Sequence, residues 1–223
     1  MRIPLSARLQ SCCDFVRPGD RVADIGCDHG YLAIHVLTEG VARSVIAADI
    51  NEGPLSAARA NARRFGCESK MTFCLSDGVE DIPRDFDVLV IAGMGAQTMV
   101  HILSAAPWLT GRRLVLQPQN KPHLLRSWLC DNGWHICAES LVRDGRFLYA
   151  VMEAVFEPSP ALTPGQCWLS PALLACGHPE LKEYISRTLT ILRKNVLGDP
   201  SLRPALAELD NTLSKEANHG NCQ

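Results

Sequence analysis

The chain has 223 residues, of which 47% are hydrophobic and 21% charged, and its formal net charge is −2. This length suits one full domain with an appendage, and the nearly balanced charge excludes a generally cationic nucleic-acid coat while allowing a local basic patch. No apolar run reaches the ~18 residues of a membrane span, and the first residues lack the apolar region of a signal peptide. We therefore expect a cytoplasmic protein that does not associate with membranes.

The ten cysteines include no C-x-x-C pair. Several of them, such as Cys74 and Cys130, lie inside or beside apolar stretches, where a thiol behaves as a small apolar side chain. We expect free cysteines rather than a disulfide framework, and no bound metal.

Apolar strands and amphipathic helices alternate along the first 157 residues. The hydrophobic pattern predicts helices over 5–16, 31–37, 54–65, 98–103 and 122–132, and strands over 21–25, 44–49, 71–75, 86–92 and 113–117. Two more strands, 135–142 and 147–156, flank an Asp-Gly pair, which is a strong hairpin signal. The order predicts an α/β, Rossmann-like fold whose mostly parallel sheet is covered on both faces and closed by an antiparallel hairpin.

The composition changes after Glu157. Pro158, Pro160 and Pro164 indicate a linker, and helical patterns follow over 179–196 and 202–213. We expect residues 1–157 to form one domain and residues 158–223 to form a linker and a C-terminal helical hairpin.

The most informative segment runs from Val22 to Leu32. It is an apolar strand containing Asp24, followed by the turn Gly26-Cys27-Asp28-His29-Gly30-Tyr31. Glycine lets a backbone approach a ligand closely, but the acids depart from the G-x-G-x-x-G fingerprint of dinucleotide sites. Carboxylates here repel phosphates and favour a cationic ligand, so S-adenosylmethionine fits the turn better than NAD.

Acids and glycines also follow the other predicted strands, at the edge where open parallel sheets bind ligands. Asp49 is placed to bond the hydroxyls of a ribose, Asp77 before Gly78 to accept from an adenine amine, and Gly93 and Gly95 to allow close backbone approach. Each residue also has a plainer interpretation as a turn or capping residue.

The segment Gln117-Pro118-Gln119-Asn120 follows the fifth strand, and its amides are able to donate to and accept from a nucleobase edge. A basic cluster in the same part of the sequence is a candidate for holding phosphates, although charge runs are commonly solvated faces. Its members are Arg112, Arg113, Lys121 and Arg126.

Several motifs taken together resemble the bacterial TrmK family, the tRNA (adenine-N1)-methyltransferases that act on the adenine at tRNA position 22. They are Leu5-Ser6-x-Arg8-Leu9, Ala23-Asp24-Ile25-Gly26-x-Asp28-His29-x-Tyr31-Leu32, Ile91-Ala92-Gly93-Met94-Gly95, and Leu116-Gln117-Pro118 with Arg126-x-Trp128-Leu129. The resemblance implies a class I methyltransferase fold, S-adenosylmethionine as cofactor and tRNA as partner. The family often has glycine where Ala96 stands, serine where Cys27 stands, and Gln-Pro-Asn where this chain has Gln117-Pro118-Gln119-Asn120.

From the residues and the resemblance we predict a cofactor site made of Asp24, Gly26, Cys27, Tyr31, Asp49, Ile50, Asp77, Gly78, Ala92, Gly93 and Met94. In the catalytic step we expect Asp28 to stabilise the charge that develops on the methylated adenine, and His29, Gln117 and Asn120 to orient the base. The helical hairpin would grip tRNA, and the enzyme would act as a monomer or weak dimer. A small-molecule methyltransferase and a non-catalytic cofactor-binding regulator remain as alternatives.

Overall fold

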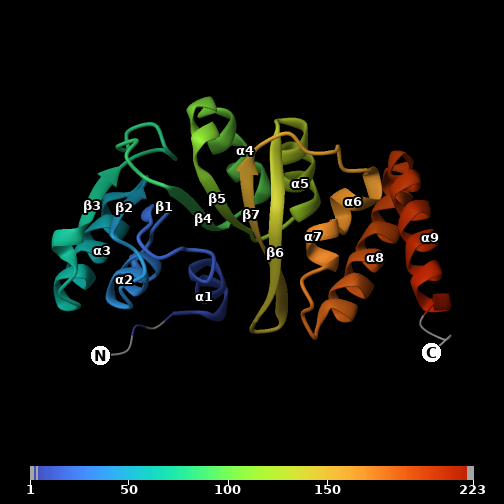
Figure 1. The fold of residues 1–223 in the computed structure, drawn as a ribbon, viewed down its shortest axis with the longest axis horizontal. Helices are drawn as coiled ribbons and strands as arrows, with labels where there is room; N and C mark the ends of the chain where they lie inside the picture. The colour runs from blue at the N-terminus through green and yellow to red at the C-terminus, as the bar shows by residue number, and fades with distance from the viewer. Residues whose placement is uncertain (1–2, 4, 220–223) are drawn as a thin grey trace.

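The computed structural model describes residues 3 and 5–219 and contains one seven-stranded sheet with helices on both faces (Figure 1). The strand order is β3-β2-β1-β4-β5-β7-β6. The five parallel strands are β1 (Arg21–Ile25), β2 (Ser44–Asp49), β3 (Met71–Leu75), β4 (Val88–Met94) and β5 (Arg113–Pro118). The hairpin of β6 (Trp134–Asp144) and β7 (Phe147–Phe156) adds antiparallel strands at one edge, with β7 next to β5.

Alternation of side chains along the strands divides the core into two layers. On one face Val22, Val45 and Val88 pack against α1 (Ala7–Cys13), α2 (Tyr31–Thr38) and α3 (Glu52–Arg64). On the other face Ala23 and Leu89 pack against α4 (Ala96–Ser104) and α5 (Pro122–Asp131). Strands buried on both sides are apolar throughout, which is why the sequence pattern located them.

The structure confirms the predicted α/β architecture and the antiparallel hairpin, with small shifts at the element ends. α1 is shorter than the predicted 5–16, because Ser6 caps its start and the chain tightens after Cys13 into single turns ahead of Pro18. β4 begins and ends two residues later than predicted, and Met94 still pairs with Pro118 of β5 across a bulge.

The segment after β7 contains more structure than the predicted linker. Two short helices, α6 (Pro164–Trp168) and α7 (Pro171–Leu174), each begin with a proline at the first position, where its missing N–H costs nothing. Thr163 and Ser170 cap these helices. Of the three prolines that indicated a linker, Pro164 therefore starts a helix, while Pro158 and Pro160 lie in the irregular segment before it.

The C-terminal part completes the molecule beside the β6–β7 edge (Figure 1). It consists of α8 (Leu181–Gly198) and α9 (Arg203–His219), separated by a short 3-10 turn, and short 3-10 segments also occur at Glu68–Lys70 and Pro107–Gly111. Trp168, Leu173 and Leu192 belong to the same hydrophobic cluster as α4 and α5. Within the described residues, no helix is long and apolar enough to cross a bilayer.

One buried ion pair ties this part to the sheet. Arg126 of α5 is fully buried and its guanidinium donates to Glu139 of β6 at 2.8 and 3.0 Å. The same guanidinium donates to the Trp168 carbonyl at 3.0 Å, and Ser170 bonds the Glu139 carboxylate. Because every partner of the pair is buried, loss of either charge leaves the other uncompensated.

Candidate cofactor-binding and active site

The turn after β1 is a series of left-handed residues. Gly26, Asp28 and Gly30 have φ values of +72°, +50° and +73°. A Cβ at Gly26 would lie 2.3 Å from the Met94 Cε, and one at Gly30 would lie 3.0 Å from the Ala58 Cβ. Glycine is therefore required at both ends of the turn, while Asp28 stands in the middle in a conformation that aspartate adopts more readily than most residues.

Asp24 is the electrostatic centre of this turn. It is buried, and its Oδ2 atom has no hydrogen-bond partner among the described residues. Burial and, to a smaller extent, the nearby Asp49 charge raise the pKa of Asp24 to about 7, against the opposing effect of a backbone hydrogen bond from Ala33. An unpartnered buried carboxyl is stabilised in its charged form by a cation, so this position suits a ligand ammonium group.

Asp49, at the end of β2, forms a hydrogen bond with the same turn. Its carboxylate accepts from the Asp28 N–H at 3.3 Å and from the Asn51 N–H at 3.0 Å. Next to it, the apolar side chain of Ile50 is 60% exposed. The end of β2 therefore presents a carboxylate followed by an exposed apolar side chain.

Asp77 and Gly78 follow β3 on a turn closed by the buried Ser76. Ser76 Oγ donates to the Gly78 carbonyl at 3.2 Å and accepts from the Asp81 N–H at 3.1 Å. Asp77 is exposed, and a Cβ at Gly78 would lie 3.0 Å from Ile102 of α4. The turn therefore leaves the Asp77 carboxylate free for a ligand.

The loops after β1, β4 and β5 are joined directly. Gly93, with φ of +82°, donates its N–H to Gln117 Oε1 at 3.1 Å, and the Met94 carbonyl accepts from the Gln119 N–H at 2.8 Å. Ala92 ends the regular pairing of β4 with β5 before this loop. Met94 in turn covers Gly26 of the first loop. Three strand ends thus form one rigid edge.

Gln117 and Arg8 together brace that edge. Gln117 is fully buried, and its Oε1 also accepts from Arg8 Nη1 at 2.8 Å. A Cβ at Gly93 would lie 2.7 Å from the same Arg8 nitrogen, so the close approach requires glycine. Gln117 therefore does not present an amide to a substrate, contrary to the sequence-based expectation. Arg8 was assigned no role from the sequence, although its motif was part of the resemblance.

Asp28, His29 and Asn120 are the predicted catalytic residues that are exposed. His29 Nε2 lies 3.7 Å from Asp28 Oδ1, and the His29 ring is 5.7 Å from the Tyr31 ring. Asn120 lies beside Gly95, where a Cβ would be 3.5 Å from its Oδ1. The side-chain amide that lies next to Gly95 is thus that of Asn120. Cys27 of the first loop is buried, and burial raises its thiol pKa.

Comparison with known proteins identifies the family. Residues 5–152 match the family model of a methyltransferase domain. A tRNA (adenine(22)-N(1))-methyltransferase of Bacillus subtilis is 34% identical over 68% of this chain, which spans 65% of that relative's length. A Mycoplasma genitalium relative named "Putative tRNA methyltransferase MG248" is 33% identical over 87% of this chain and 88% of its own.

A solved structure agrees with these relatives. Streptococcus pneumoniae Sp1610, described as "a putative tRNA (m1A22) methyltransferase", is 28% identical, has a TM-score of 0.84, and covers 94% of this chain and 99% of its own. It has also been solved in complex with S-adenosyl-L-methionine. The chain belongs to the TrmK family. Its sheet and helices accordingly have the class I methyltransferase fold that the sequence predicted.

The basic cluster predicted for this TrmK-family chain does not form at the site. Arg113 pairs with Asp20 and with Glu153, where the latter distance is 2.9 Å. Arg126 is buried against Glu139, and Arg112 donates to the Arg84 carbonyl at 2.9 Å. Arg112 and Arg113 stand at the start of β5, at the opposite end from the site, so only Lys121 of the cluster remains near it.

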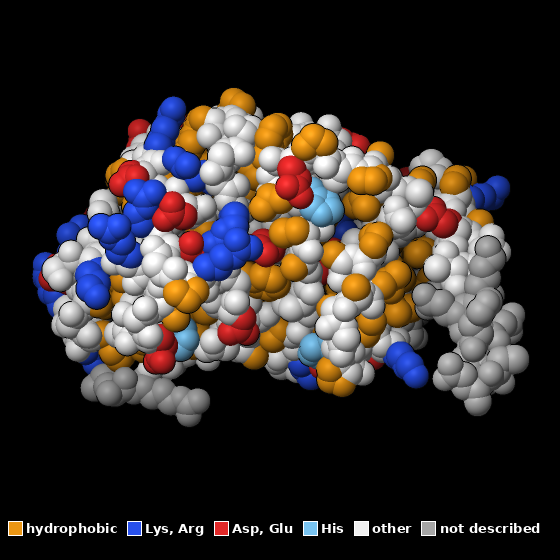
Figure 2. Space-filling model, in the orientation of Figure 1, with side chains coloured by type: hydrophobic (Ala, Val, Ile, Leu, Met, Phe, Trp, Pro, Cys, Tyr) orange, Lys and Arg blue, Asp and Glu red, His pale blue; other side chains and the backbone are white. Residues whose placement is uncertain are grey.

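Other charges of the chain are distributed without a dominant sign. On the face in Figure 2, Lys and Arg side chains gather over the half of the molecule that holds α2 and α3, with acidic side chains among them. Hydrophobic side chains are more frequent over the half that holds α6, α7 and α8. Within the described residues, no group of three or more His, Cys, Asp or Glu side chains is arranged to hold a metal ion.

Proposed function

We propose that this chain transfers the methyl group of S-adenosylmethionine to N1 of an adenine in tRNA, with the adenine at position 22 as the target suggested by its TrmK relatives. The observation that carries the cofactor assignment is the buried carboxyl of Asp24, whose unpartnered oxygen lies beside the glycine turn. The ammonium group of S-adenosylmethionine would supply the partner that this oxygen lacks. A phosphate would be repelled there.

The remaining cofactor contacts follow from the strand ends. Asp49 would bond the ribose hydroxyls, the exposed Ile50 would cover one side of the adenine, and Asp77 would accept from its amine. The backbone at Gly93 and Gly26, which has positive φ at both positions, would pass beside the methionine part. When bound, the cofactor supplies a methyl group activated by a sulfonium.

Methyl transfer to adenine N1 requires positioning more than proton removal, because N1 carries a free lone pair. N1 attacks the methyl carbon while the bond from carbon to sulfur breaks, leaving S-adenosylhomocysteine and a cationic adenine. The exposed carboxylate of Asp28 would stabilise that charge as it develops. His29 and Asn120 would hold the edge of the base, while Gln117 and Arg8 would keep the loops in place.

The target base must leave the tRNA stack before it reaches these residues. Flipping a nucleotide costs a few kcal/mol, which contacts of the protein with the displaced strand must offset. We expect the C-terminal helices to contribute those contacts, because they flank the β5 loop that bears Asn120. A monomer or weak dimer would suffice for this arrangement.

The proposal is tested by incubating the purified protein with labelled S-adenosylmethionine and unmodified bulk tRNA, followed by nucleoside analysis. N1-methyladenosine is the expected product. An Asp28→Asn variant should bind the cofactor as the wild type does and lose at least tenfold in turnover, while Asp14→Asn, an exposed acid at the end of α1, should retain it.

Two outcomes would contradict the proposal in different ways. Unchanged turnover in Asp28→Asn would end the role of that carboxylate. Cofactor binding without any methylated nucleoside would leave the cofactor site intact and favour a small-molecule methyltransferase or a regulator.

A further inference from the structure

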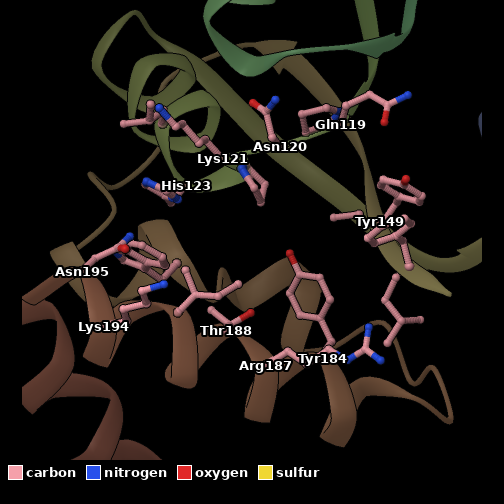
Figure 3. A pocket seen from close by; sticks show the side chains of 18 of the residues that line it. Gln119, Asn120, Lys121, His123, Tyr149, Tyr184, Arg187, Thr188, Lys194 and Asn195 are labelled. Atoms are coloured by element: carbon pink, nitrogen blue, oxygen red, sulfur yellow. The ribbon is translucent and has the colours of Figure 1, made fainter.

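A cavity of about 930 Å³ lies next to the proposed reaction site, between the β5 loop, the β6–β7 hairpin and α8 (Figure 3). Its volume is within the range of roughly 300–1,000 Å³ for ligand pockets. Asn120 lines the cavity and also lies against Gly95 of the β4 loop. The cavity is thus continuous with the edge of the sheet where Asp28, His29 and Asn120 were assigned to the base.

The walls of the cavity carry more positive than negative charge. Lys121 comes from the β5 loop and Lys194 from α8, and among the described residues neither is in an ion pair. The one acid in the lining is Asp199, whose Oδ1 accepts from the Ser201 N–H at 3.1 Å and from its hydroxyl at 2.6 Å, and the lining Arg187 is paired with Glu183. Two unpaired lysines thus stand against one carboxylate. The cavity therefore favours an anion.

Rings supply a second kind of contact. Tyr149 of β7 and Tyr184 of α8 both line the cavity (Figure 3). On the side of the β5 loop, the His123 ring stacks on Trp168 with centroids 3.8 Å apart and an angle of 8° between the planes. Burial and the nearby Arg126 and Lys121 charges lower the pKa of His123 to about 4, so this ring is neutral at pH 7.

Lys121 also has an uncommon backbone. Its φ is +47°, and it and Asp28 are the two residues other than glycine with positive φ in the described part of the chain. Both follow strands at the edge of the sheet that forms the site, one after β1 and one after β5. Such conformations concentrate at functional positions because the surrounding structure must hold them.

We infer that this cavity holds a nucleotide of the substrate strand that neighbours the target adenine, with its phosphate at Lys121 and Lys194 and its base against Tyr149. Unpaired lysines together with aromatic rings that line a cavity are the combination by which proteins bind single-stranded nucleic acid without reading its sequence. The inference rests on the proposed function, because it takes the occupant to be part of the same tRNA. The cavity would then capture the strand as the target nucleotide leaves the stack.

The first experiment measures tRNA affinity of the whole protein against salt concentration for the wild type, Lys194→Ala and Lys182→Ala. Lys182 is the matched control, since it is an exposed lysine of the same helix that does not line the cavity. Loss of one phosphate contact to a single strand should make the slope of log K against log salt shallower by about 0.7. We expect this change in Lys194→Ala and a wild-type slope in Lys182→Ala.

A second pair of variants tests the proposed contact between the Tyr149 ring and the base. Tyr149→Leu should raise the KM for tRNA by about fivefold or more, whereas Tyr149→Phe, which keeps the ring, should remain near the wild type. Both should leave the affinity for S-adenosylhomocysteine unchanged, because Tyr149 is not among the residues assigned to the cofactor.

The results separate this inference from the function on which it rests. If the wild type methylates tRNA but Lys194→Ala and Tyr149→Leu keep its salt slope and KM, the cavity inference is wrong and the proposed function stands. If the wild type neither binds nor methylates tRNA, both are overturned. Equal decreases of the salt slope in Lys194→Ala and Lys182→Ala would also refute the cavity inference, since they would indicate a diffuse attraction of the whole helix for tRNA.

Discussion

Cofactor affinity should depend on pH through Asp24. The pKa of this buried carboxyl is raised from 3.8 to about 7, so ionising it in the folded protein without ligand costs about 4 kcal/mol more than in water. A cationic ligand group binds the ionised form. Below about pH 7 the carboxyl must first lose its proton, and the apparent affinity falls by about tenfold per pH unit.

The expected magnitude follows from the fraction of Asp24 that is ionised. With a pKa of about 7, that fraction is about eight times larger at pH 7.5 than at pH 6, so the Kd for the cofactor product should be about eightfold tighter at pH 7.5. The stability of the protein without ligand changes with pH in the opposite direction. Its folded state binds the additional proton between pH 4 and pH 7, so its free energy of unfolding falls as the pH rises through that window.

Isothermal titration calorimetry with S-adenosylhomocysteine measures this dependence directly, and it avoids turnover. At pH 6 the titration should release nearly one proton per bound ligand, seen as a difference between buffers with different ionisation enthalpies. Asp24→Asn should bind weakly at every pH without the dependence. Asp49→Asn should shift the midpoint to lower pH, because the Asp49 charge is the second cause of the raised pKa.

Asp14→Asn serves as the control and should keep the wild-type profile, since Asp14 is exposed at the end of α1. The reasoning is refuted if the wild-type affinity is flat between pH 6 and pH 7.5. It is equally refuted if Asp24→Asn keeps the wild-type slope, because another group would then be responsible.

Three further variants test the scaffold of the site. Gly26→Ala should weaken cofactor binding by at least tenfold, measured by calorimetry, because φ of +72° is strained for alanine and a Cβ there would displace the Met94 Cε atom; an affinity equal to the wild type would contradict this. Arg8→Ala should lower turnover while changing the thermal stability little, because it removes the hydrogen bond that holds Gln117 against Gly93 at the end of β4. Arg8→Lys should restore part of the lost turnover. Arg126→Met should reduce the free energy of unfolding by about 3–5 kcal/mol in urea denaturation, because Glu139 is left buried and unpaired. The additional replacement of Glu139 by Leu should recover much of that loss, and a double variant as unstable as the single one would argue against the buried charge as the cause.

The elements of this protein were largely predictable from the sequence. The strand Ser44–Asp49, for example, begins and ends where predicted, because a strand buried on both faces is a continuous apolar run with polar residues at its ends. The edge that carries the proposed cofactor site was predictable for a related reason. In a parallel sheet all carboxyl ends lie on one side, so Asp24, Asp49 and Gly93 had to converge.

Tertiary structure alone decided which polar side chains remain available. Arg113 and Arg126 look like their neighbours in the sequence, yet one pairs with Asp20 and Glu153 and the other is buried against Glu139. Gln117 was expected to face a substrate and is instead buried against Gly93. These partners are far away along the chain, and local patterns carry no information about them.

The cavity beside Asn120 is likewise a feature that only the tertiary structure decided. Its walls come from the β5 loop, the β6–β7 hairpin and α8, three segments whose spacing depends on how the C-terminal helices pack against the sheet. Composition and periodicity determined which segments would be strands and helices and where their polar ends would meet. Long-range packing determined which charges are neutralised, which remain free, and where space is left for a ligand.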